Sequence, residues 1–174
     1  MRSRTDSAFT LERFRLAGHG HLHGARCILE AAKTASGPVP ALALASACYL
    51  VQVALECGIK ARILERGGCT SVEELKRKQP KVYDPLFVTK QGHDLDKLAK
   101  QLGVDRLMAT MGRGWREDDC WQRLTSSERP FSLRYGTENI DDAVATEEVE
   151  RCAELLSVLL SGLMRTRRRR LEKK

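Results

Sequence analysis

The chain has 174 residues, enough for one domain with a substantial core. Hydrophobic residues make up 42% and charged residues 30% of it, a globular composition that excludes a disordered polymer. The formal net charge is +7, and aromatic residues are only 5% while leucine, alanine and glutamate are abundant, which favours helices.

Five helical segments are predicted, and no strand pattern competes with them. The proline-containing stretch 36–40 ends the first, the glycine pair 67–68 ends the second, and a capping box at 71–74 opens the third. The expected helices are about 8–33, about 41–66, 71–78, 93–103, and a last one from near 146 into the C-terminal residues. Together they predict an all-α, antiparallel bundle of about five helices.

The segment between the fourth and last helices is less regular. Residues 115–127 have helical character, whereas RPFSLRYG at 129–136 is expected to be extended or turn-like. A loop that contains Pro85 is also predicted between Pro80 and the fourth helix.

The positive charge lies mainly at the C-terminus. Residues 165–174 contain seven basic residues and one acidic residue, so they carry +6 and leave +1 on residues 1–164. We therefore divide the chain into a helical bundle, 1–164, and a basic tail, 165–174. Such a tail either attracts nucleic acid or anionic membrane through counterion release or is a solvated helix end. Its candidate nucleic-acid contacts are Arg167, Arg168, Arg169 and Arg170.

Several classes of site and location are disfavoured. The six cysteines lack a C-x-x-C pair, so we expect reduced thiols, mostly in the core, and no zinc ribbon. In GHGHLHG, 18–24, only two histidines would share a helix face, too few to hold a metal ion. We expect no cofactor or metal, no membrane association and, without an N-terminal secretion signal, a cytoplasmic location.

The most informative stretch is SACYLVQVALECGIKARIL, residues 46–64. Its apolar residues surround the helix, as in a central helix covered by others. Gln52, Glu56 and Lys60 interrupt it at intervals of four and therefore form one narrow polar stripe. The stripe faces a partner helix, faces a polar cleft, or is an exposed seam with an ordinary Glu56–Lys60 pair.

This helix, followed by GHDLDKL at 92–98, resembles the HEPN domain (higher eukaryotes and prokaryotes nucleotide-binding). The spacing of small and apolar residues in the first helix and the Arg134–Tyr135 pair ahead of the last helix fit the same family. The resemblance covers about residues 8–165. It implies a dimeric helical bundle, a small nucleotidyltransferase as partner, and a role in toxin–antitoxin or defence systems.

The resemblance further implies RNA as a substrate and metal-independent ribonuclease activity. The polar stripe would then face a cleft containing His93, Asp94, Arg134 and Tyr135. The ribonuclease members carry an arginine, four to six residues and then a histidine late in the chain, but this chain has no histidine after His93.

Two catalytic pairs are therefore candidates, because the reaction needs an imidazole and a cation. They are His93 with Arg134, and Arg15 with His21 in the first helix. The alternatives are that Asp94 serves only as a helix cap and that Arg134 pairs with Glu56. The alternative function is a non-catalytic, dimeric binding and assembly module.

Overall fold

The computed structural model describes residues 9–36, 39–84, 87, 93–103, 119–126, 129–134 and 138–171; the side chains of residues 39 and 162–171 are not described. These residues contain helices and no strand, so the predicted all-α class is confirmed. The helices are α1 (Leu11–Ala32), α2 (Val39–Arg66), α3 (Val72–Lys78), α4 (Pro80–Tyr83), α5 (Leu95–Leu102), α7 (Asp119–Thr125), α8 (Arg129–Arg134) and α9 (Asp142–Leu171).

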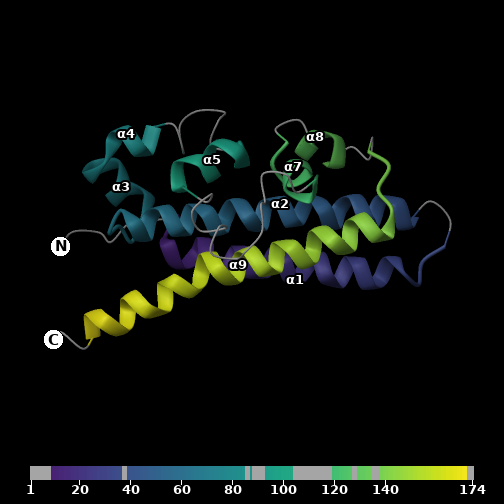
Figure 1. Ribbon diagram of the computed structural model, residues 1–174, viewed down its shortest axis with the longest axis horizontal. Coiled ribbons are helices and arrows are strands. Elements are labelled where there is room, and N and C mark those ends of the chain that lie inside the picture. Colours follow the sequence, from purple (N-terminus) through teal and green to yellow (C-terminus); the bar gives the residue numbers. More distant parts are fainter. Residues whose placement is uncertain are drawn as a thin grey trace, which may run out of the picture.

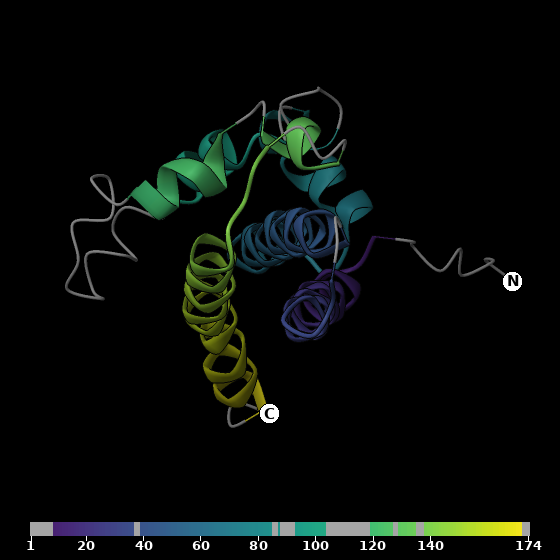
Figure 2. The ribbon, with the colours of Figure 1, turned by 90° about the vertical axis from the view of Figure 1, so that its right-hand side faces the viewer.

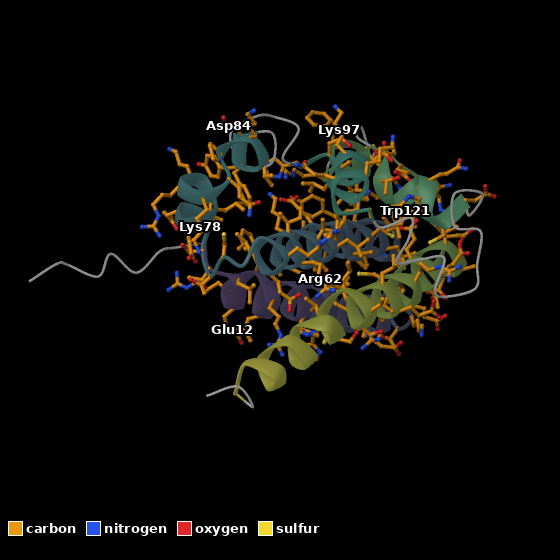
Figure 3. All side chains as sticks on the ribbon, turned by 60° about the vertical axis from the view of Figure 1, so that its left-hand side comes forward. Glu12, Arg62, Lys78, Asp84, Lys97 and Trp121 are labelled. Carbon is orange, nitrogen blue, oxygen red and sulfur yellow. The ribbon has the colours of Figure 1, made fainter. Side chains whose placement is uncertain are left out.

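The long helix α2 is the centre of the fold. Figures 1 and 2 show α1 and α9 on one side of it and the short helices α3, α4, α5, α7 and α8 on the other. Side chains fill the space between α2 and these short helices, while Lys97 and Asp84 lie on their outer side (Figure 3). The burial of Val51, Leu55 and Leu64 confirms the prediction of a central helix.

The bundle is not antiparallel throughout, which corrects the prediction. Helices α1 and α2 run in opposite directions, and α1 approaches α2 closely where Gly18 lies beside Ala54 and Cys57. Helix α9 instead runs parallel to α2: Cys152 contacts Val51, and further along both helices Leu156 packs against Gly58. The reason is topological: the short helices carry the chain back along α2, so α9 starts at the end where α2 starts.

The first four predicted helix starts lie within three residues of the observed ones, whereas α9 starts at Asp142, before the predicted start near 146. Thr10 caps α1 by accepting from the backbone N–H of Arg13. Ser71 caps α3 by accepting from Glu74, as the capping box predicts. Asp94 caps α5 by accepting from Lys97, and Gly103, with φ of 67°, ends it in the left-handed conformation.

Two local predictions were wrong. Residues 129–134 form the helix α8 and not an extended segment. Its proline is the second residue, where the missing N–H costs no helical hydrogen bond, and the helix buries Arg129 and Leu133. Similarly, Pro80 begins the short helix α4 where we expected a loop. The predicted count of about five helices also omitted these short elements.

Two features bear on membrane and nucleic-acid binding. Among the described helices, one segment of α2, Pro40–Arg66, is long and apolar enough to cross a bilayer, a test that core helices also pass. Helix α9 continues to Leu171, so residues 165–171 of the predicted tail extend this helix. Figure 1 shows its last turns diverging from α1 and α2.

Candidate functional site

One face of α2 carries the candidate site. Tyr49, Gln52, Val53 and Glu56 follow one another at helical spacing, so their side chains leave α2 toward α5 and α8. Lys60 continues the same stripe by one turn. The polar stripe seen in the sequence is thus turned toward the short helices.

Glu56 lies between two nitrogen-bearing side chains. The Nδ1 atom of His93 is 3.1 Å from both carboxylate oxygens of Glu56. The ammonium of Lys60 is 2.6 Å from Oε1 of the same carboxylate. The Lys60 side chain is only 8% exposed and that of Glu56 18%, whereas that of His93 is 77% exposed. The carboxylate therefore connects a buried cation to an imidazole at the surface.

Lys60 is further held by an aromatic ring. Its Nζ lies 5.3 Å from the centroid of the Phe87 ring, a cation–π contact. Phe87 also packs with Tyr83 and Phe14. This aromatic group covers Lys60 and leaves its ammonium directed at Glu56.

Arg134 approaches the stripe from the end of α8. Its Nη2 donates a hydrogen bond of 2.5 Å to the hydroxyl of Tyr49, and its guanidinium carbon lies 5.1 Å from the centroid of that ring. Arg134 is exposed, so the cation stays accessible to a ligand. The predicted pairing of Arg134 with Glu56 remains a prediction, although both residues line the same cavity.

The cavity between α2, α5 and α8 has a volume of about 100 Å³. Its lining divides into an apolar part and a polar part. Val53, Leu95 and Pro130 are apolar; Tyr49, Gln52, Glu56, His93, Ser126 and Arg134 supply the polar groups. The cavity is smaller than the roughly 300–1,000 Å³ of ordinary ligand pockets.

Gln52 and Asp94 are held in defined positions. The amide nitrogen of Gln52 donates to the backbone carbonyl of Leu124 at 3.3 Å, and the residue is 4% exposed. Asp94 Oδ1 accepts from the backbone of Lys97, so its capping role is observed directly. Gln52 therefore lies in the cavity wall, and Asp94 fixes the turn that presents His93.

The other catalytic candidates are not brought to this cavity. Arg15 and His21 lie on α1, on the far side of α2 from α5 and α8 (Figure 2). Because His21 follows Arg15 by six positions, the two residues lie roughly 9 Å apart along the helix axis and on different faces of the helix. Arg15 lies 3.6 Å from Glu12. Tyr135 falls outside the described residues, as do the side chains of Arg167, Arg168, Arg169 and Arg170.

A second charged cluster was missed by the sequence analysis. Arg129 lies 2.8 Å from Glu138 and 2.8 Å from Glu148, and Arg123 lies 3.1 Å from Glu148. Glu148 is fully buried and Arg129 is 5% exposed. The sequence does contain a signal for Glu148. This residue follows Ala145 by three positions and precedes Cys152 by four, so it lies on the apolar face of α9.

The geometry of this cluster indicates ion pairing more than ideal hydrogen bonding. Within the described residues, both terminal nitrogens of Arg129 and Oε2 of Glu148 lack an aligned hydrogen-bond partner. Burial lowers the pKa of Arg129, but its contacts with Glu148 and Glu138 outweigh burial and raise it. The cluster joins α8 to α9 beside an open cavity of about 960 Å³ lined by α7, α8 and Glu138.

The cysteines are unsuited to nucleophilic chemistry at this site. All six thiols are free, and four of them are buried. Burial, with the charge of Glu56 in addition, raises the pKa of Cys57 to about 11. Burial likewise raises the pKa of Cys48 and of Cys152. Such thiols stay protonated at neutral pH and act as small core residues. No group of three or more metal-ligating side chains occurs in the described part of the chain.

No protein-family model, curated protein or solved structure matches the chain. The site itself combines an imidazole oriented by a carboxylate with a guanidinium on the same cavity. That arrangement suits proton transfer beside an anion.

Proposed function

We propose that this protein is a metal-independent endoribonuclease of the HEPN type, with His93 and Arg134 at the cleavage site. The observation that carries the proposal is the contact of His93 Nδ1 with both oxygens of Glu56 beside a cavity that Arg134 also lines. The order of the sequence features and the all-helical fold support the family assignment.

The contact with Glu56 defines what His93 can do. An ionised carboxylate only accepts hydrogen bonds, so Nδ1 of a neutral His93 must carry the proton. The Nε2 atom then has its lone pair free to accept a proton. Because the His93 side chain is 77% exposed, a substrate can reach this nitrogen.

In the proposed reaction, Nε2 of His93 takes the proton of an RNA 2′-hydroxyl. The 2′-oxygen forms a bond to the adjacent phosphorus, and the bond from phosphorus to the 5′-oxygen breaks. The departing 5′-oxygen takes a proton from water, and His93 later returns its own proton to solvent. Arg134 stabilises the charge that develops on the phosphate oxygens. The products are a 2′,3′-cyclic phosphate and a 5′-hydroxyl.

The deciding experiment is RNA cleavage in excess chelator. We expect the wild type to cleave, and His93→Ala and Arg134→Ala each to lose at least about a hundredfold in rate. His21→Ala tests the other pair, and His19→Ala, an exposed histidine of α1, is the matched control. Cleavage that survives His93→Ala would exclude this site.

An inactive wild type would favour the alternative, a non-catalytic binding and assembly module. The small volume of the cavity and the contact of Arg134 with Tyr49 support that alternative. Binding of RNA without cleavage would then be the function of the same residues.

The partners are also proposals. We propose a homodimer that acts with a small nucleotidyltransferase in a toxin–antitoxin or defence system in the cytoplasm, with RNA as the target. Light scattering tests the dimer, since a species of only 19.5 kDa at tens of micromolar would contradict it. Co-purification with the product of a neighbouring gene tests the second partner.

A further inference from the structure

Four exposed residues of α1 share one face of the helix: Leu16, Gly20, His23 and Cys27. They follow one another at intervals of four, three and four residues, which places them within one narrow stripe. The opposite face of α1 holds its buried residues, which are Gly18, Leu22, Ala25, Leu29 and Ala32. The stripe therefore lies at the surface, away from the core.

Two metal-binding side chains meet on this stripe. Sγ of Cys27 lies 3.7 Å from Nε2 of His23. In a tetrahedral zinc site, with Zn–S of about 2.3 Å and Zn–N of about 2.0–2.1 Å, a sulfur and a nitrogen ligand lie about 3.5–3.6 Å apart. The two donor atoms are thus already at nearly the separation that a shared zinc ion requires.

The chemistry of the pair favours the same ion. Thiolate and imidazole ligands suit zinc, whereas magnesium and calcium take oxygen ligands. Cys27 is the exposed one of the six cysteines; four others are buried, and Cys57 is partly buried. An ion can therefore reach Cys27 from solvent, and its thiol can release a proton there on binding.

One chain supplies only half of such a site. A structural zinc ion takes four protein ligands. Within the described ranges, no group of three or more metal-ligating side chains occurs, and Glu30, the next residue along the stripe, contacts Lys33 at 2.7 Å. A second copy related by a two-fold axis would supply the same histidine and cysteine again, which completes a Cys₂His₂ set.

The rest of the stripe is suited to a second copy. Leu16 is 62% exposed and gives apolar surface that a neighbouring helix would cover. A Cβ atom built on Gly20 would meet no atom within 4 Å, so the space above this part of the helix is open. Two α1 helices can therefore approach each other beside the histidine–cysteine pair.

We propose that His23 and Cys27 form half of a zinc site, and that two copies of the chain meet through α1 to complete it. On binding, each Cys27 thiol releases its proton to solvent, and two thiolates and two imidazoles ligate the ion. The site lies on the far side of α2 from the cavity of His93 and Arg134 (Figure 2). It is a structural site that does not depend on the proposed cleavage, and it names a surface through which two copies associate.

Zinc titration of the full chain tests the proposal. The protein is freed of metal with a chelator, exchanged into buffer with a reductant, and titrated with zinc while light scattering follows its mass. We expect one zinc ion to bind per two chains and the mass to double from its metal-free value. Cobalt in place of zinc should produce the near-ultraviolet absorption of thiolate-to-cobalt charge transfer and the visible bands of tetrahedral cobalt.

Three variants at exposed positions connect the ion to the pair. Cys27→Ser and His23→Gln each remove two of the four ligands, so each should weaken zinc binding at least about a hundredfold and abolish the doubling of mass. Cys27→Ser should also lose the charge-transfer band. His19→Gln, one turn before His23, is the matched control and should bind zinc as the wild type does. Thermal unfolding without metal shows that each variant is folded.

Several outcomes would overturn the zinc site. One ion bound per chain without a change in mass would contradict the second copy, and zinc affinity that survives Cys27→Ser would exclude the thiolate. Loss of binding in His19→Gln would show that the two histidines hold the ion instead. A mass in chelator of already twice 19.5 kDa that zinc does not change would exclude this site but leave the homodimer proposal intact.

Discussion

Arg129 and Glu148 form an ion pair inside the protein: Arg129 Nη2 lies 2.8 Å from Glu148 Oε1, with the side chains 5% and 0% exposed. Arg129 also contacts Glu138, and Glu148 also contacts Arg123. The pair joins the short helix α8 to the long helix α9. Since α8 carries Arg134, the position of the candidate site depends on this connection.

Removal of one partner of this pair should destabilise the fold strongly. We expect Arg129→Met or Glu148→Leu to lower the free energy of unfolding by about 3–5 kcal/mol, because each leaves a buried charge poorly compensated. The double variant should lose less than the sum of the two, since it removes both charges. Urea unfolding measures the three values, and additive losses would show that the two side chains are not coupled.

Under the proposed mechanism, Glu56 should be needed for cleavage because it orients His93. In Glu56→Gln, the amide can donate to Nδ1 of His93 and favour the wrong tautomer, so the rate should fall at least about tenfold. Lys60→Met should cause a smaller loss, because Lys60 acts only through Glu56. Initial rates in chelator provide the test. Glu30→Gln, which breaks an exposed Glu–Lys pair on α1, is the control and should leave the rate unchanged.

Glu74 should make stability depend on pH in the acid range. Its hydrogen bond with Lys78, followed by those from Thr70, lowers its pKa from the ordinary 4.5 to about 2. The carboxylate form is favoured in the folded chain, so this stabilisation is fully present above the unfolded-state value and disappears as pH falls through the folded value.

The experiment compares urea unfolding of the wild type and Glu74→Gln across this range. The difference in unfolding free energy should be constant above about pH 5 and shrink as the pH approaches 2. Glu154→Gln controls for the loss of one negative charge. A difference that does not change with pH would show that the contribution of Glu74 does not depend on its charge.

The basic C-terminal residues should supply most non-specific RNA affinity. Residues 165–174 carry +6 of the net +7, so their deletion should remove most binding at low salt and flatten its salt dependence. Replacement of Arg167, Arg168, Arg169 and Arg170 by glutamine keeps the length and should have a similar effect. Filter binding over a salt series measures both. Affinity that survives truncation would locate RNA binding on the helical bundle.

The sequence alone predicted those features that depend on local chemistry and periodicity. The all-α class, the central helix and the caps at Ser71 and Asp94 all follow from residue spacing and short-range hydrogen bonds. The interval of four between Gln52, Glu56 and Lys60 likewise set their common face. These features required no knowledge of distant contacts.

Tertiary structure decided the rest, because it depends on which distant segments meet. The parallel course of α9 beside α2 follows from the path of the intervening short helices, and α8 forms where Arg129 and Leu133 become buried. The contact of His93 with Glu56 spans 37 residues, and that of Arg134 with Tyr49 spans 85. Spacing within one helix predicts a face, but only packing between helices determines which side chains face each other across a cavity.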